Sequence, residues 1–193
     1  TGNGSTNAQT GLGFQPDWVW LKGRSNSGSH KLMDAVRGSS SSLCSNNSNA
    51  AEGADYFSSF DSNGFTVNGT SNDINANGQT YVGWNWKANG QGSANTDGTV
   101  NSTYTSANTT SGFSISTYTG NGTSGATIGH GLGVAPAVVL VKRLNATSDW
   151  VMYHKGMGAS KFIVLNTNST EASSAGIFYN TAPTSSIFYV GSD

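Results

Sequence analysis

The sequence predicts an all-β protein made of two related antiparallel β-sandwich units in tandem, of the lectin or jelly-roll type. Three observations predict this fold class: a long internal repeat, short runs of alternating apolar residues bounded by glycine and proline, and a composition rich in turn-forming residues. Of 193 residues, 26 are glycine, 10% are aromatic and only 10% are charged. This composition is typical of a β protein with many turns.

A long internal repeat is the first of these observations. Residues 11–38 return as residues 131–158, so the two copies are separated by a constant offset of 120 residues. The shared positions are turn glycines, a proline, an apolar position and a lysine, which specify a scaffold rather than a binding site. The coinciding pairs are Gly11 and Gly131, Leu12 and Leu132, Gly13 and Gly133, Pro16 and Pro136, Lys22 and Lys142, and Gly38 and Gly158.

The repeat divides the chain into three predicted parts. Residues 1–89 form the first sandwich unit, residues 112–193 form the second, and residues 90–111 form a linker rich in Gly, Ser, Thr and Asn. Comparison of the copies predicts that the first unit lacks its leading strand and the second unit its final strand. Either the sequence is an excerpt of a longer repetitive protein or neighbouring chains supply the missing strands, and we favour the excerpt.

Short alternating runs locate the strands of each unit. Residues 17–22 and 138–142 carry apolar side chains on both faces between glycine and proline, which predicts an interior strand at the centre of each unit. A hairpin is predicted over residues 56–67, with its turn at 61–64. The other predicted strands are 30–36, 43–47 and 75–88 in the first unit, and 112–118, 150–154, 163–167 and 185–191 in the second.

Composition and charge argue against several classes of protein. The formal net charge is -1 and no basic stripe is present, so a nucleic-acid partner is not expected. No apolar run approaches the roughly 20 residues of a membrane span, so no membrane partner is expected either. Cys44 is the single cysteine; we expect it to be a small buried hydrophobic residue next to Leu43.

Residues with the spacing of a catalytic site are not found. Glycoside hydrolysis on a β-sandwich needs two facing carboxylates, and no two acidic residues alternate on a predicted strand. The three histidines, His30, His130 and His154, have no nucleophile motif beside them and no metal-ligand spacing. We therefore expect no catalytic residues, and a polysaccharide-degrading enzyme is kept only as an alternative.

One segment imitates a calcium-binding loop. Asp73, Asn75 and Asn77 alternate before Gly78, which matches the first six positions of the loop of an EF-hand. The twelfth position, normally a bidentate glutamate, is Trp84, and strands rather than helices are predicted on both sides. These three residues are candidate Ca²⁺ ligands; otherwise no cofactor is expected.

Sugar binding is the other chemistry that the composition supports. Tryptophan and tyrosine stack on the apolar faces of sugar rings, while amide and carboxylate groups bind the hydroxyls. We expect such contacts from two loops that differ between the copies, with core positions for Trp18, Trp20, Trp84 and Trp86, which have strand spacing. The candidate carbohydrate-binding residues are Asn26, Ser29, Asn145, Asp149 and Trp150.

Several motifs together resemble a known repeat domain. They are GFQPDWVWLKGRS, FDSNGFTV, TYVGWNWKANG, and GFSISTYTGNG followed by GHGLGVAP. The chain outside residues 90–111 resembles a tandem-repeat β domain of virion structural and tail-fibre-like proteins of marine phages, especially phages of cyanobacteria. The resemblance implies a non-enzymatic, lectin-like β-sandwich at a particle surface, with no catalytic residues to assign. Asn85 departs from it, because a small residue or cysteine is expected there.

These observations predict a non-enzymatic phage virion structural protein, a tail fibre or a capsid-surface decoration, that attaches to host-surface glycans. Its expected location is the virion surface, and its expected partners are other virion subunits, further copies of the same chain and a host glycan. A bacterial extracellular adhesin or filament subunit is the first alternative. The polysaccharide-degrading enzyme is the second, and it would require facing carboxylates in a groove.

Overall fold

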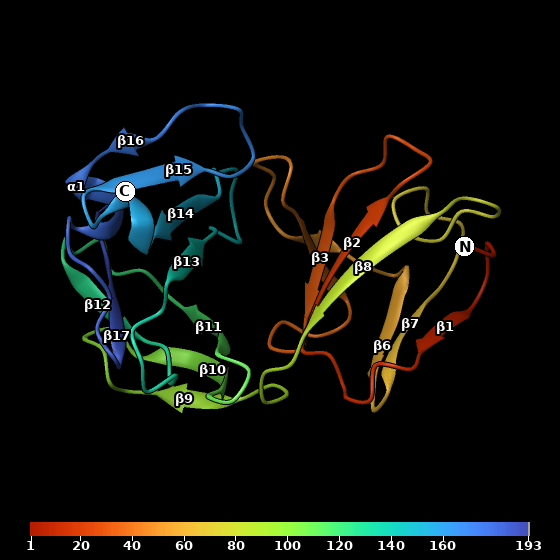
Figure 1. The fold of residues 1–193 in the computed structure, drawn as a ribbon, viewed down its shortest axis with the longest axis horizontal. Coiled ribbons are helices and arrows are strands. Elements are labelled where there is room, and N and C mark those ends of the chain that lie inside the picture. Colours follow the sequence, from red (N-terminus) through yellow and green to blue (C-terminus); the bar gives the residue numbers. More distant parts are fainter. Residues whose placement is uncertain (193) are drawn as a thin grey trace.

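The structure is a computed structural model that describes residues 1–192, and its regular elements are almost all β-strands. The strands lie in two groups, which are seen on the two sides of Figure 1. We call strands β1 to β8 the N-terminal group and strands β9 to β17 the C-terminal group. The ladders between named strands are all antiparallel, so the predicted all-β antiparallel class is confirmed.

The N-terminal group forms two sheets. Strand order is β5-β4-β3-β2-β8 in one sheet and β1-β7-β6 in the other. The predicted hairpin at residues 56–67 is confirmed as β6 and β7, and Asp61 at its turn accepts hydrogen bonds from the hydroxyls of Ser59 and Thr66. The bounds are β1 (Asn7–Thr10), β2 (Trp18–Gly23), β3 (Lys31–Asp34), β4 (Ser41–Cys44), β5 (Glu52–Gly53), β6 (Phe57–Asp61), β7 (Gly64–Val67) and β8 (Tyr81–Trp86).

The C-terminal group forms three sheets within the described residues. Their orders are β13-β14-β15-β16, β12-β17 and β11-β10-β9. A 3₁₀ helix at Lys155–Met157 and a four-residue helix, α1 (Ala175–Phe178), complete the group. The strand bounds are β9 (Ser93–Asn95), β10 (Ser102–Asn108), β11 (Phe113–Tyr118), β12 (Ala126–Gly129), β13 (Val138–Val141), β14 (Val151–His154), β15 (Lys161–Val164), β16 (Ala172–Ser173) and β17 (Ile187–Val190).

The internal repeat is visible in the strand order. Strands β2, β3, β4 and β5 are adjacent in sequence and in space, and so are β13, β14, β15 and β16, each of which starts 120 residues later. The pair β1-β7 has a counterpart in β12-β17. Turn glycines keep their left-handed conformations as well, with φ of 75° at Gly13 and 74° at Gly133. A side chain at these positions would be strained, which explains why glycine recurs at both.

The repeat breaks at one edge. Strand β2 lies between β3 and β8, whereas β13 has β14 as its single hydrogen-bonded neighbour in residues 1–192. The expectation that residues 138–142 form an interior strand is therefore wrong. Val138 and Leu140 on the outer face of β13 are 44% and 36% exposed. The apolar pattern on both faces does not reveal whether a neighbouring strand is present.

Residues 90–111 are not the extended linker that their composition predicts. They contain β9 and the seven-residue β10, which pairs with β11 from Asn108↔Phe113 to Ser102↔Tyr118. Hydroxyl groups rather than apolar side chains fill the buried face of β10: Thr105 Oγ1 lies 2.8 Å from Ser102 Oγ and 2.9 Å from Ser116 Oγ. Such a strand has no apolar alternation, which is why composition suggested a linker.

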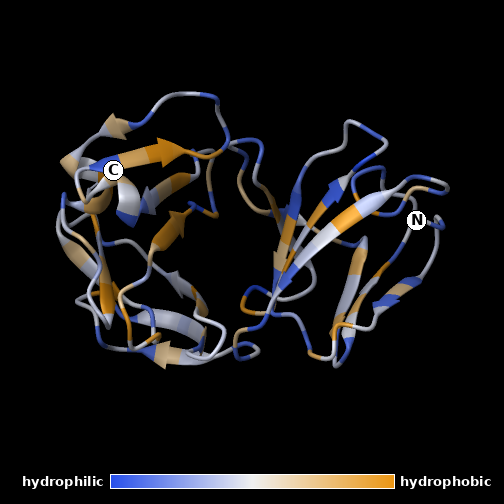
Figure 2. Ribbon diagram, in the orientation of Figure 1, coloured by the Kyte–Doolittle hydropathy of each residue, from blue (hydrophilic) through white to orange (hydrophobic). Residues whose placement is uncertain are grey.

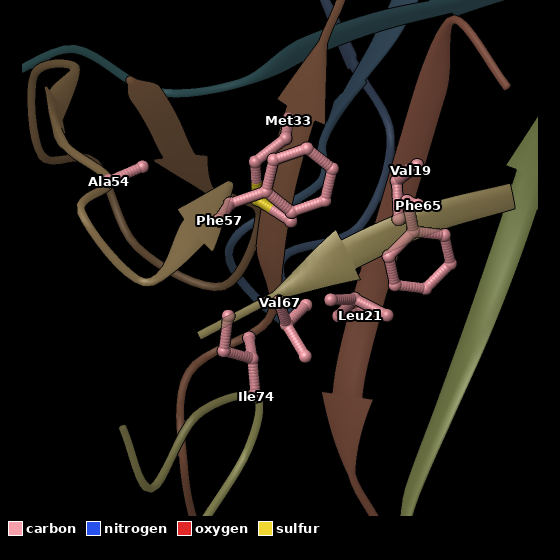
Figure 3. Packing of buried hydrophobic residues seen from close by; sticks show 8 residues of the cluster. All are labelled: Val19, Leu21, Met33, Ala54, Phe57, Phe65, Val67 and Ile74. Carbon is pink, nitrogen blue, oxygen red and sulfur yellow. The ribbon is translucent and has the colours of Figure 1, made fainter. Parts of the chain in front are cut away.

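Each group has its own apolar core between its sheets. In the N-terminal group, Val19 and Leu21 of β2 and Met33 of β3 meet side chains of β6 and β7 (Figure 3). In the C-terminal group, Val139 of β13 meets Ile128 of β12, together with Tyr153, Phe178 and Phe188. Figure 2 shows apolar residues concentrated on strands such as β13 and β15, while many loops are hydrophilic. No helix in residues 1–192 is long and apolar enough to cross a membrane.

Candidate functional site

The two groups of strands meet around Trp150. Its side chain is 3% exposed and packs in a cluster with Leu32 of β3 and Leu43 of β4, and its Nε1 donates a 2.8 Å hydrogen bond to the carbonyl oxygen of Cys44. A sugar cannot stack on a ring that is covered in this way. The expectation that Trp150 contacts carbohydrate is therefore corrected: Trp150 joins the two groups.

Backbone hydrogen bonds and a second aromatic contact strengthen this junction. Ala51 N donates to Leu144 O at 2.8 Å, and Ser148 N donates to Ser48 O at 2.9 Å. At a second contact, the ring of Phe113 in β11 lies 5.9 Å from the rings of both Trp18 and Trp86. These distances are typical of attractive aromatic pairs. The two groups of strands are thus in contact at two separate places.

A pocket of about 320 Å³ opens beside Trp150 at the junction. Its volume is at the lower end of the range of small-molecule sites, roughly 300–1,000 Å³. Both groups of strands contribute to its wall, so neither group contains the pocket alone. The lining residues are Trp20, His30, Ser45 and Asn46 from the N-terminal group, and Leu165, Asn166 and Thr167 from the C-terminal group.

Equivalent loops of the two copies face this pocket. Asn46 Oδ1 accepts a 2.9 Å hydrogen bond from His30 N, and 120 residues later Asn166 Oδ1 accepts a 2.8 Å hydrogen bond from Trp150 N. Each asparagine thereby fixes the loop that precedes β3 or β14. The amide nitrogen of Asn46 and the second lone pair of its Oδ1 therefore remain for a ligand.

Two polar atoms of the pocket residues are buried without a hydrogen-bond partner in the described part of the chain. They are Oγ of Ser45, a residue that is 3% exposed, and Nε1 of Trp20. An unpaired buried hydroxyl or N–H group costs about 1–3 kcal/mol. Both atoms are covered by neighbouring protein atoms, so a ligand that carries hydroxyls pairs with them only when the wall shifts to expose them.

The pocket is electrically neutral near pH 7. None of its lining residues is an acid, a lysine or an arginine. Burial, with a smaller contribution from the charge of Lys22, lowers the pKa of His30 below its ordinary value, so this histidine is uncharged at neutral pH. The wall therefore combines an indole, two amides and hydroxyl groups, which suits a neutral hydroxylated molecule better than an ion.

The other candidate sugar-binding residues lie in loops outside this pocket. Asn26 Oδ1 accepts from Gly28 N, and Ser29 N donates to Asp73 Oδ1, so both residues hold the β2-β3 loop together. In the C-terminal group, Asn145 Oδ1 accepts from Arg143 Nε and Asp149 Oδ1 accepts from Asn166 Nδ2. Asp149 is thus linked to the pocket through Asn166, while the structure does not bring Asn26 and Asn145 to a common site.

The three candidate calcium ligands have other partners. Asn75 is completely buried; its Oδ1 accepts from Asn3 N and Asn7 Nδ2, and its Nδ2 donates to backbone oxygens. The Asp73 carboxylate accepts from Ser29 N and lies 3.4 Å from the ammonium group of Lys31.

Asn77 is exposed. A calcium site needs several oxygen ligands directed to one point, and these residues do not fit that requirement. In residues 1–192 no cluster of three or more His, Cys, Asp or Glu residues is placed to hold a metal ion.

Cys44 lies where the sequence predicts, whereas the tryptophans do so only in part. Cys44 is buried, as expected, and burial raises the pKa of its thiol. Trp18 and Trp20 pack against the cluster of Trp150, but Trp84 is 46% exposed beside Trp20, at a ring distance of 5.7 Å. A core position for Trp84 is therefore wrong.

Sequence reasoning identified none of the seven pocket residues as a ligand contact. Only one signal pointed towards them, namely that Asn46 and Asn166 coincide when the copies are aligned. The two copies face each other through these loops only in the three-dimensional structure. An alignment of the copies does not show this contact.

Fold and pocket together define an all-β protein of antiparallel sheets in which two repeated groups of strands share one neutral, aromatic and polar pocket. The chain belongs to the family described as "Domain of unknown function (DUF7483)", which matches residues 1–193. The comparisons with curated proteins and with solved structures found no match.

Proposed function

We propose that the chain is a non-enzymatic structural module of a phage virion, a tail fibre or capsid-surface decoration, that binds a neutral glycan of the host surface. The observation that carries the binding role is the pocket between the two groups, whose lining residues supply an indole, two amides and hydroxyl groups. The virion assignment rests on the motifs quoted above, and other virion subunits, including further copies of the chain, are its proposed partners.

The same proposal includes a finer description of the fold: two related antiparallel sandwich units in tandem. Its support is the shared strand order of the two groups and the apolar core that lies between sheets in each. A rigid scaffold of this kind positions loops for binding without itself taking part in chemistry. The pocket lining contains no carboxylate, which supports a binding role over glycoside hydrolysis.

Glycan binding is tested with an array of neutral oligosaccharides and with the variants Ser45→Ala and Trp20→Phe. Each variant removes one unpaired polar group, and we expect each to weaken binding roughly fivefold, which corresponds to about 1 kcal/mol for one hydrogen bond. Ser45→Ala should be at least as stable as the native chain, because it removes a buried hydroxyl that has no partner in the described residues. Weaker glycan binding without a loss of stability in Ser45→Ala separates a ligand-binding role of Ser45 from a structural one.

Trp84→Phe is the matched control, since Trp84 is an exposed tryptophan outside the pocket lining. It should leave glycan affinity unchanged. Incubation with the bound glycan should release no reducing sugar. Unchanged affinity of both pocket variants would contradict the proposed site, and release of sugar that a single Asp or Glu substitution abolishes would contradict the non-enzymatic role.

A further inference from the structure

The edge of β13 that faces away from β14 has no strand beside it in residues 1–192. Hydrogen-bonding directions alternate along a strand, and Ala137 O accepts from Lys155 N on the β14 side. The backbone groups of Val138, Leu140 and Lys142 therefore point to the open side. Exposed N–H and C=O groups in a row are a template for another strand.

The N-terminal group shows what occupies this position in the other copy. There β8 pairs with β2 in the register Trp18↔Trp86, Trp20↔Trp84 and Leu21↔Gly83. With the offset of 120 residues, Val138, Leu140 and Val141 take the places of Trp18, Trp20 and Leu21. The open edge of β13 is thus the edge that β8 covers on β2.

The side chains at this edge are exposed as well. Val138 and Leu140 are 44% and 36% exposed. Val134 is 62% exposed, but it precedes the strand and is not one of its ladder positions. In the N-terminal group the corresponding outer face carries the aromatic pair Trp20 and Trp84. Side chains of a β8-like strand would lie beside Val138 and Leu140 and would remove both from water, which stabilises association by about 25 cal/mol per Å² of apolar surface.

The contacts of β8 also define which strand would fit. Gly83 lies so close to β2 that a Cβ there would be 2.9 Å from Leu21 Cδ2. In the N-terminal group a small residue thus lies opposite Leu21, and Val141 holds the place of Leu21 on β13. Aromatic side chains are accommodated opposite Trp20 and Trp18, because Trp84 and Trp86 of β8 lie there. Leu140 and Val138 hold the places of Trp20 and Trp18 on β13.

We propose that the open edge of β13 binds an extended segment of the β8 type as an added antiparallel strand, with a small residue opposite Val141 and aromatic residues opposite Leu140 and Val138. This surface is separate from the glycan pocket. Strand addition of this kind derives its affinity from main-chain hydrogen bonds and its specificity from alternate side chains.

The experiment uses the 193-residue chain and a labelled peptide with the sequence of residues 79–88. Fluorescence anisotropy should show saturable binding. With the peptide at about ten times its Kd, hydrogen exchange of the amides of Val138, Leu140 and Lys142 should slow roughly tenfold, because only the free fraction exchanges. Peptide affinity should not change in Ser45→Ala, which keeps this test independent of the glycan pocket.

Two matched pairs of controls test the register. In the peptide, N-methylation of Trp84 removes an N–H that would face β13 and should abolish binding, whereas N-methylation of Asn85 removes one that faces away and should be tolerated. In the protein, Leu140→Lys should weaken binding at least tenfold, whereas Val134→Lys should have little effect.

The proposal would be overturned by an absence of peptide binding, or by equal binding of the two N-methylated peptides. It would also be overturned if the amides of β13 were protected without peptide in a concentration-dependent dimer, since a second copy would then occupy the edge. Amide exchange of β14 serves as the check that Leu140→Lys remains folded.

Discussion

Among single residues, Trp150 contributes most visibly to the contact between the two groups of strands. Its indole ring packs with Leu32 and Leu43, and its N–H group donates to the carbonyl oxygen of Cys44. We expect Trp150→Ala to lower the free energy of unfolding by about 3–5 kcal/mol, because it leaves a cavity in a buried cluster. Urea unfolding followed by circular dichroism measures this loss.

The variant Trp150→Phe separates the ring from its hydrogen bond. Phenylalanine keeps most of the apolar contact but leaves the Cys44 carbonyl oxygen without this donor, so a smaller loss of about 1–3 kcal/mol is expected. A loss below 1 kcal/mol in the alanine variant would show that the junction does not depend on this side chain.

His130 makes stability depend on pH. Its ring is buried, Nδ1 accepts from Leu132 N, and Nε2 therefore carries the proton and lies 3.2 Å from Thr184 O. Burial lowers the pKa of His130, although Thr184 and Asp97 partly oppose this. A histidine whose pKa is lower in the folded chain opposes folding when it is protonated. Its contribution to the free energy of unfolding is therefore complete above about pH 6.5 and is lost as pH falls.

Thermal unfolding at pH 8 and pH 5 tests this dependence. The melting temperature of the native chain should fall more between these pH values than that of His130→Gln, which cannot take up the proton. The pKa of His30 is lowered as well, so both proteins retain some dependence, and the difference between them isolates His130. Equal decreases in the two proteins would assign the pH dependence elsewhere.

Among the secondary-structure elements, the contact of β8 with β2 places Gly83 against the side chain of Leu21. A Cβ there would lie 2.9 Å from Leu21 Cδ2, and Leu21 is itself buried. Valine has a high β propensity, yet we expect Gly83→Val to destabilise the chain by about 1–3 kcal/mol, because overpacking outweighs propensity. Adding Leu21→Val should restore part of the loss, and purely additive effects in this double-mutant cycle would refute the contact.

How well the sequence predicts an element depends on what buries it. Strands β2, β6 and β7 are predicted well, because apolar side chains alternate with polar ones or are bounded by turn residues. Strand β10 has the sequence STYTSAN and is buried through hydroxyl contacts of Ser102, Thr105 and Ser106, which leave no apolar periodicity to read. The open edge of β13 is equally hidden, since its apolar pattern matches that of the covered strand β2.

The candidate site could be predicted less well than the fold. The type of chemistry, indole and amide groups, follows from composition. The loops that differ between the copies do not supply it, since the indole belongs to Trp20 of β2 and the amides of Asn46 and Asn166 are at equivalent positions. The identity of the residues does not follow from composition, because the pocket forms where the copies meet. Trp150 and His30 are at equivalent positions, yet Trp150 is buried by the opposite group. Ser45 and Leu165 are also equivalent, and both line the pocket. An alignment of the copies carries no information on which loops are covered.

At the scale of the whole molecule, the junction should make the two groups unfold together. Hydrogen bonds such as Ala51 N to Leu144 O and the cluster of Trp150 would both be lost if one group unfolded alone. Differential scanning calorimetry is expected to give one transition with equal calorimetric and van't Hoff enthalpies. In Trp150→Ala the same scan should separate into two transitions, and two transitions in the native chain would contradict the coupling.

Because the pocket is built from residues on both sides of the junction, one group of strands contains only half of it. The number of pockets in a longer array of such groups would equal the number of junctions, one fewer than the number of groups. Weak binding at each junction would then add up along the array, with an effective concentration set by the rigid spacing of successive junctions. Lengthening the array would raise avidity without any change in the pocket itself.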